Sequence, residues 1–272
     1  MFTTLYIREL QNYLYSLRFQ VSFVIVVLVF TLGSVSFASS FKDMHDNYTK
    51  YSVAQQEAIG KQAENISKVA TARNSFIISP RENSVIADCK ESYLPNRITY
   101  SAYNVFDYSV RHDSNNPLLI RTDSLSWSFI VSMFLSFLTL IFAFDSISGE
   151  KEERTLALVF SNAVPRRTFL CSKLLSIITV IGVMELVGII ISLIILAVSG
   201  QVQLNSSFLI ETAGFILISL LFITTFAVFG LLSSVVTRYS NISLLISLCF
   251  WLFAAVVIPN TSVFWAKTLF SI

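Results

Sequence analysis

Residues 145–156 read Asp145-Ser-Ile-Ser-Gly149-Glu150-Lys151-Glu152-Glu153-Arg154-Thr155-Leu156, and the triplet Pro165-Arg166-Arg167 follows shortly after. This segment is the one dense cluster of charge between two apolar stretches that are each long enough to cross a bilayer. Charge in such a position lies where the membrane meets water, and a soluble partner can bind it there. The segment is therefore the first candidate for a functional site.

The composition is that of an integral membrane protein. Of the 272 residues, 54% are hydrophobic and 13% are charged, against about 25% charged residues in an average soluble domain, and the mean hydropathy is +0.68. A membrane-spanning helix needs about 20 mostly apolar residues, and five windows meet this condition, near 19–38, 125–144, 173–198, 208–233 and 242–258. The sequence predicts an all-α polytopic membrane protein with five spans, the first of them a retained signal anchor.

Basic residues near the span ends predict the orientation, because cytoplasmic loops carry an excess of Lys and Arg. The short loop 200–207 has no charged residue. The basic residues all lie on one side if the N-terminus is cytoplasmic; they are Arg8 and Arg18, then Lys151, Arg154, Arg166, Arg167 and Lys173, then Arg238. This orientation leaves residues 41–122 and the C-terminus outside.

The spans divide the chain into four segments. Residues 1–18 are amphipathic and predict a helix along the cytoplasmic interface, with a short helix packed on a partner as the alternative, and residues 19–40 form the first span. Residues 41–122 are polar and predict an extracytoplasmic α+β insert between spans 1 and 2: 42–73 lacks proline and favours helix, whereas 98–110 favours strands. Residues 123–272 form the transmembrane core.

Between the second and third spans the residues predict a short helix. Gly149 is expected to end one helix, and the acidic residues after it to begin another, about 150–161, where the helix dipole favours negative charge. Pro165 then ends that helix, so the whole cytoplasmic segment covers about 146–165. Such a helix fits a groove in a soluble partner, and a solvated hairpin is the alternative.

The spacing of this segment resembles the permease subunits of ABC transporters of the second exporter type, the type V exporter fold, in the branch with a large outward insert after the first span. The matching residues are Asp145, Ile147, Gly149, Glu150, Glu152, Thr155, Leu156, Ser161, Pro165, Arg167 and Lys173. In that family the segment is the coupling helix that docks on the ATP-binding subunit. Arg154 departs from the pattern, since the family often has Gly there. The family usually has six spans where five are visible, so we expect the chain to continue to a sixth, with a re-entrant turn over 261–272 as the alternative.

The resemblance implies a function and a set of partners. It implies a non-catalytic exporter subunit of the bacterial inner membrane that works with two ABC ATP-binding subunits and a second permease, identical or similar. The insert 41–122 can recruit a periplasmic partner, shape an exit or hold two permeases together, and its residues do not decide among these roles. No GxxxxGK[ST] loop occurs, so ATP and Mg are expected on the partner chain. The implied ATPase-coupling residues are Asp145, Gly149, Glu150, Glu152, Glu153, Thr155, Leu156, Pro165 and Arg167. The alternative function is a membrane anchor or sensor that transports nothing.

Glu185 is the one acidic residue expected near the middle of a span, where ionisable side chains are costly and often functional. One interpretation is a carboxyl hydrogen-bonded to a neighbouring helix, for instance to Thr224 or Thr225. The alternatives are a place on the substrate path and a role in proton coupling. No metal site is expected, because Cys89, Cys171 and Cys249 are isolated, and the charge balance gives no reason to expect nucleic acid.

Overall fold

The computed structural model of the protein describes residues 2–62, 74–77, 79–87, 97–100, 107–109, 125–161, 164–200, 202, 205–259 and 261. The chain divides into two compact units. Unit 1 comprises Met1–Thr31, Ser128–Ser192 and Leu209–Ile272, and unit 2 comprises Leu32–Trp127 and Leu193–Phe208.

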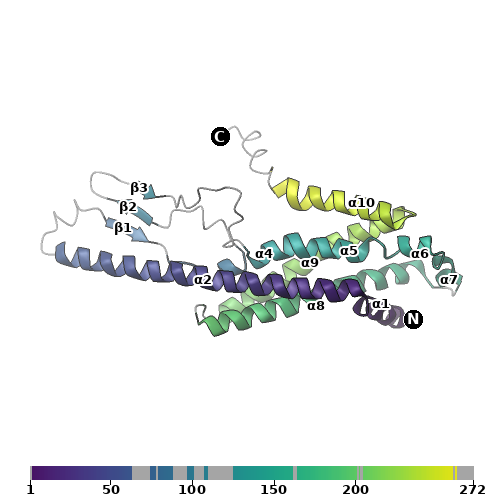
Figure 1. Ribbon diagram of the computed structural model, residues 1–272, viewed down its shortest axis with the longest axis horizontal. Helices are drawn as coiled ribbons and strands as arrows, with labels where there is room; N and C mark the ends of the chain where they lie inside the picture. Colours follow the sequence, from purple (N-terminus) through teal and green to yellow (C-terminus); the bar gives the residue numbers. More distant parts are fainter. Residues whose placement is uncertain are drawn as a thin grey trace. The chain divides into compact units, whose positions relative to one another are not determined.

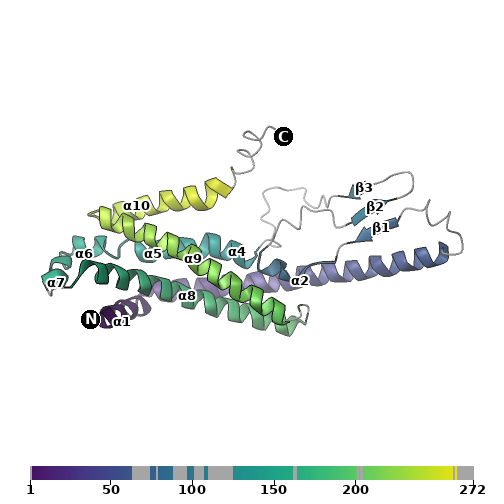
Figure 2. The same cartoon turned by 180° about the vertical axis from the view of Figure 1, so that it is seen from behind.

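Helices, several of them long, make up most of the described chain (Figure 1). In order they are α1 (Phe2–Leu14), α2 (Leu17–Gln62), α4 (Trp127–Ile130), the π-helical stretch η4 (Val131–Leu135), α5 (Ser136–Ala143), α6 (Ser148–Glu152), α7 (Leu156–Ser161), α8 (Arg166–Ser199), α9 (Ser206–Val236), α10 (Ser240–Trp251) and the π-helical stretch η5 (Leu252–Val257). In both views α1, α6 and α7 lie at the same end of the helices of unit 1 (Figures 1 and 2).

Five described helices are long and apolar enough to cross a membrane, as the sequence predicts. They are Leu17–Lys61, Trp127–Glu152, Arg166–Ser199, Ser206–Val236 and Ser240–Val257. Each contains or overlaps one of the five predicted windows, so the prediction of five spans is confirmed by length and composition. The chain is a multi-pass membrane protein.

Helix α2 runs without a break through the predicted boundary between span and insert, as the helix predicted from residue 42 onward requires. The sequence places that boundary at residues 40 and 41, whereas α2 continues without interruption to Gln62. The reason is local, because 42–62 has no proline and is rich in residues that favour helix, and a polar continuation does not end a helix. Residues 63–73, also predicted as helix, lie outside the described residues.

The described part of unit 2 also contains a small antiparallel sheet of order β1-β2-β3. Strand β1 (Asn74–Ile77) pairs with β2 (Arg97–Tyr100), with Asn74 opposite Tyr100, and β2 pairs with β3 (Asp107–Ser109), with Arg97 opposite Ser109. A short 3-10 helix, η1 (Glu82–Val85), lies between β1 and β2. Strands β2 and β3 fall within or beside the stretch 98–110, where β-branched and aromatic residues are frequent.

Glycines allow two close helix contacts in unit 1. A β-carbon at Gly188 in α8 would lie 2.5 Å from the ring of Phe30 in α2, and one at Gly230 in α9 would lie 2.5 Å from the β-carbon of Ala143 in α5. Phe30 and Ala143 are both fully buried. Small residues commonly permit such approaches between membrane helices, and these two contacts fix α2 against α8 and α5 against α9.

Candidate functional site: the α6 junction

The charged segment of the sequence folds as two short helices, α6 and α7, and not as the single helix predicted over 150–161. The turn between them contains Arg154, whose φ of 59° is the only positive value of a non-glycine residue in the described chain. That region of backbone space favours glycine. The resemblance marks this same position as one where glycine is frequent, and the break between the helices gives the physical reason.

Gly149 does not end a helix, which corrects a second expectation. Helix α5 ends at Ala143, the turn 144–147 follows, and Gly149 is the second residue of α6. Its amide donates to the carbonyl of Asp145 at 2.9 Å. The turn ends the preceding helix earlier than the glycine, so glycine is not needed there as a C-terminal cap.

Helices α6 and α9 cap each other. The hydroxyl oxygen of Ser234 accepts hydrogen bonds from the backbone amides of Ile147 at 2.9 Å and Ser148 at 2.8 Å, at the start of α6. In return the ammonium of Lys151 donates to the carbonyls of Ser234 at 3.2 Å, Val235, and Thr237 at 2.9 Å, at the end of α9. Both sets of backbone groups lack partners within their own helices, so each helix satisfies the other.

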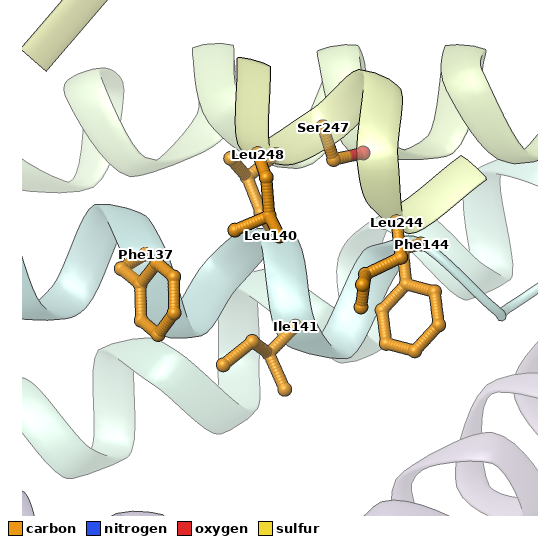
Figure 3. A pocket seen from close by; sticks show the side chains of 7 residues that line it. All are labelled: Phe137, Leu140, Ile141, Phe144, Leu244, Ser247 and Leu248. Atoms are coloured by element: carbon orange, nitrogen blue, oxygen red, sulfur yellow. The ribbon is translucent and has the colours of Figure 1, made fainter. Parts of the chain in front are cut away.

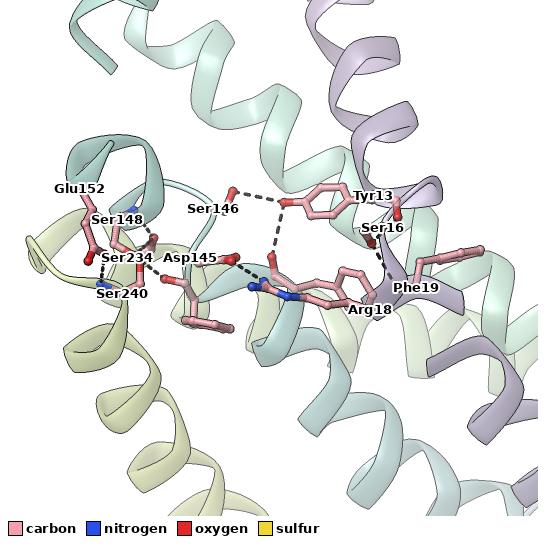
Figure 4. Close-up of polar contacts among 12 residues, drawn as sticks. Tyr13, Ser16, Arg18, Phe19, Asp145, Ser146, Ser148, Glu152, Ser234 and Ser240 are labelled. Carbon is pink, nitrogen blue, oxygen red and sulfur yellow. Dashed lines mark hydrogen bonds and ion pairs between the residues drawn. The ribbon is translucent and has the colours of Figure 1, made fainter. Parts of the chain in front are cut away.

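Glu152 binds the start of a third helix. One of its carboxylate oxygens accepts from the amide of Ser240, the first residue of α10, at 3.3 Å (Figure 4). The hydroxyl of Ser148 also lies 3.4 Å from the hydroxyl of Ser240. A carboxylate at a helix N-terminus is favoured by both the free amide and the helix dipole.

Glu150 belongs to a group of three charges around the buried ammonium of Lys173. The ammonium of Lys173 in α8 lies 2.7 Å from a carboxylate oxygen of Glu150 and 3.0 Å from one of Glu9 in α1. The Lys173 side chain is only 3% exposed and also lies over the ring of Phe169. The second carboxylate oxygen of Glu150 is buried and has no hydrogen-bond partner in the described structure. Glu150 thus joins α6 to α1 and α8.

Asp145 and Ser146 join the same turn to the N-terminal helices. The guanidinium of Arg18 in α2 forms an ion pair with Asp145 and lies over the ring of Phe144. The hydroxyl of Tyr13 in α1 donates to the hydroxyl of Ser146 at 3.3 Å (Figure 4). Burial raises the pKa of the Tyr13 phenol above its usual range, so the phenol remains a donor at any physiological pH. We call these contacts of Asp145, Glu150, Lys151 and Glu152 the α6 junction.

The opposite side of the segment is exposed. Glu153 and Arg154 are exposed, and so is Leu158 in α7, at 68%. Pro165 and Arg167 are exposed, whereas Thr155 and Leu156 are half-buried. Helix α7 packs on the start of α8 through an edge contact between the rings of Phe160 and Phe169. Of the predicted coupling residues, Asp145, Glu150 and Glu152 thus bind other helices. Glu153, Pro165 and Arg167 are exposed.

Glu185 is completely buried and contacts a helix other than its own, but not at the positions suggested. The hydroxyl of Ser219 in α9 donates to one of its carboxylate oxygens, whereas Thr224 and Thr225 donate to the carbonyls of Leu220 and Phe222 in their own helix. Ser219 is closer to the start of α9 by more than one turn. The other carboxylate oxygen of Glu185 has no partner in the described residues.

A small hollow lies between α5 and α10 (Figure 3). It has a volume of about 10 Å³, about the space that one water molecule needs, so it cannot hold a substrate. Its lining is apolar except for Ser247; the other residues are Phe137, Leu140, Ile141, Phe144, Leu244 and Leu248. Nor do the described residues contain a cluster of His, Cys, Asp and Glu that could hold a metal ion.

Sequence reasoning missed the partners within the junction. The sequence places Lys151 only among the residues that predict the orientation. It places Lys173 among these and among the residues that match the family pattern, and it does not single out Ser234. Ser234 and Ser240 stand at the end of one apolar stretch and the start of the next, which is the available signal for helix capping. Nothing in the sequence pairs these serines with a loop more than 80 residues earlier.

These features define a multi-pass membrane protein in which a charged loop is bonded to several transmembrane helices. The profile of the family described as "ABC-2 family transporter protein" matches residues 3–271, and the chain belongs to that family. It is thus a permease of the ABC-2 type, and membership implies pairing with an ABC ATP-binding subunit. No curated protein and no solved structure matches the chain.

Proposed function

We propose that the chain is the transmembrane permease subunit of an ATP-driven exporter in the inner membrane of a bacterium, with its N-terminus in the cytoplasm. ATP and Mg²⁺ bind to two copies of a separate ATPase subunit, and this chain is neither an enzyme nor a cofactor-binding protein. It works beside a second permease, either a second copy or a similar chain. Residues 41–122 face the periplasm, where they can contact a periplasmic partner.

The two-sided character of the α6–α7 segment is the observation that supports this proposal best. Its inner side is bonded to α2, α8, α9 and α10 through Asp145, Glu150, Lys151 and Glu152. Its outer side presents an exposed leucine beside exposed charges. A segment with this arrangement can bind a soluble ATPase on one side and transmit its movement to the transmembrane helices on the other, as in rigid-body switching.

Copurification with an ABC ATP-binding subunit tests the proposal. We expect the wild-type chain to hold the subunit in detergent and the double variant Glu153→Lys, Leu158→Asp to lose it, because both substitutions change exposed side chains of the segment. Glu57→Lys is the matched control, since Glu57 is an exposed acidic residue of α2 in unit 2. Glu150 and Glu152 are unsuitable for this test, because reversing their charge also breaks contacts inside the permease.

Reconstitution separates an exporter from an anchor or sensor. In proteoliposomes an exporter's ATP hydrolysis rises when a transported compound is added, whereas an anchor's does not respond. In the copurification test, two results contradict the proposed function. One is a wild-type chain that binds no ATPase subunit, and the other is a double variant Glu153→Lys, Leu158→Asp that binds the subunit as well as the wild type does.

A further inference from the structure

Three consecutive residues of α6 bind three different transmembrane helices. Glu150 pairs with Lys173 of α8, Lys151 donates to the carbonyls of Ser234 and Val235 in the last turn of α9, and Glu152 accepts from the first amide of α10. Helix α6 has only five residues, so a helix this short is held in place almost entirely by these side-chain contacts. The contacts are therefore the route by which a displacement of α6 reaches each helix.

We infer that Lys151 is a positioning residue that joins α6, the end of α9 and the start of α10 into one rigid group. The inference rests on the proposed function only for its consequence, which is that a push on α6 moves α9 and α10 together. In this role Lys151 contacts no substrate, nucleotide or partner protein. It acts through the helix ends that it holds.

The chemistry of the contact supports this role. An ammonium group has three donors, and the last carbonyls of a helix are three or four acceptors without partners in that helix. Lys151 supplies its donors to two of them, those of Ser234 and Val235, and to the carbonyl of Thr237 in the turn that follows. Its positive charge is favoured at the negative end of the helix dipole. Few other side chains can make this contact. Methionine has a similar length but no donor, and the donors of an arginine lie in one plane, whereas those of an ammonium point in three directions.

The contacts on either side of Lys151 make the group cooperative. Ser234 is fully buried, and its hydroxyl accepts from the two amides that begin α6, so α9 cannot move away from α6 without exposing those amides. The turn from α9 to α10 is short, from Thr237 to Tyr239, and Glu152 binds its far end. Helix α7 lies beyond the Arg154 turn and packs instead on α8 through Phe160.

Hydrogen exchange on the whole chain in lipid nanodiscs tests the rigid group without any partner. In Lys151→Met we expect the amides of 147–152 and 234–243 to exchange about tenfold faster, because the loss of hydrogen bonds from a charged group lets these helix ends open more often. The Ser240 amide is the informative position, since Lys151 does not bind it. Arg154→Met is the matched control, as it removes an exposed cation from the same loop and should leave these amides unchanged.

Ser234→Ala provides a second test with a smaller disturbance of charge, and it should speed exchange over the same two stretches. If exchange at 240–243 is unchanged in Lys151→Met and in Ser234→Ala, or if Arg154→Met raises it equally, the rigid group does not exist. If Lys151→Met fails to fold, the Ser234→Ala result decides alone.

Distance measurements on the complex with the ATPase subunit test the consequence. Spin labels at Ser161→Cys in α7 and Leu245→Cys in α10, with the native cysteines replaced by alanine, should report a change in distance on ATP binding. Lys151→Met should keep the ATPase bound and lose the movement of α10, whereas Arg154→Met should retain it. If the wild-type chain binds no ATPase subunit, the proposed function is wrong. The rigid group is then tested by the hydrogen-exchange experiment alone, because that experiment needs no partner.

Discussion

At the scale of single residues, Arg154 holds a backbone conformation that its side chain does not favour. With φ at 59°, it carries a cost of roughly 1–2 kcal/mol relative to the right-handed region. Arg154→Gly should therefore raise the free energy of unfolding by about 1 kcal/mol, as measured by denaturant titration in detergent. Glu153→Gly is the control, because Glu153 has an ordinary φ of −78°, and glycine there should give no gain. Equal effects of the two substitutions would show that strain at Arg154 is absent.

Lys173 holds two carboxylates together, and its removal should be far more costly than that of an exposed cation. In Lys173→Met the side chains of Glu9 and Glu150 lose the buried ammonium between them, and breaking a buried ion pair costs about 3–5 kcal/mol. Arg18→Met breaks an ion pair in which the arginine is 52% exposed, and less than about 1 kcal/mol is expected there. Thermal unfolding in detergent measures both.

A triple variant checks that charge causes the effect of Lys173→Met. Glu9→Gln and Glu150→Gln, added to Lys173→Met, remove the two unpaired charges and should recover much of the lost stability. If the triple variant is no more stable than Lys173→Met, lost packing of the lysine stem accounts for the effect.

At the scale of helices, the sequence predicts what depends on composition and misses what depends on contacts. The five spans follow from long apolar windows, which have no other explanation in a chain of this hydropathy. The break between α6 and α7 does not, because 150–161 contains no glycine or proline to indicate it. The capping of α9 by Lys151 joins residues more than 80 positions apart, and no local periodicity carries that information.

The contact between α5 and α9 gives a prediction at this same scale. Gly230→Ala places a β-carbon 2.5 Å from that of Ala143, so the helices must separate, and overpacking of this kind costs roughly 1–3 kcal/mol. Gly214→Ala is the matched control in the same helix, because nothing lies within 4 Å of its β-carbon and alanine favours helix by about 1 kcal/mol. Adding Ala143→Gly to Gly230→Ala should restore stability. Thermal unfolding of the four proteins compares them, and equal loss in both single variants contradicts a close contact at Gly230.

At the scale of the whole molecule, the proposed function requires the α6–α7 segment to face the cytoplasm and residues 41–62 to lie on the periplasmic side of the membrane. Single cysteines test this in a chain whose native cysteines are replaced by alanine: Ser161→Cys in α7 and Glu57→Cys in α2, both at exposed positions. A membrane-impermeant maleimide should label position 57 in spheroplasts and position 161 only in inverted vesicles. The reverse pattern would put the exposed leucine of α7 on the side without ATP, where no ATPase subunit can bind it. Labelling of both positions from one side would mean that the second span, Trp127–Glu152, does not cross the bilayer. The basic residues before the first span and those after the second would then lie on opposite sides, which would remove the positive-inside argument for the N-terminus.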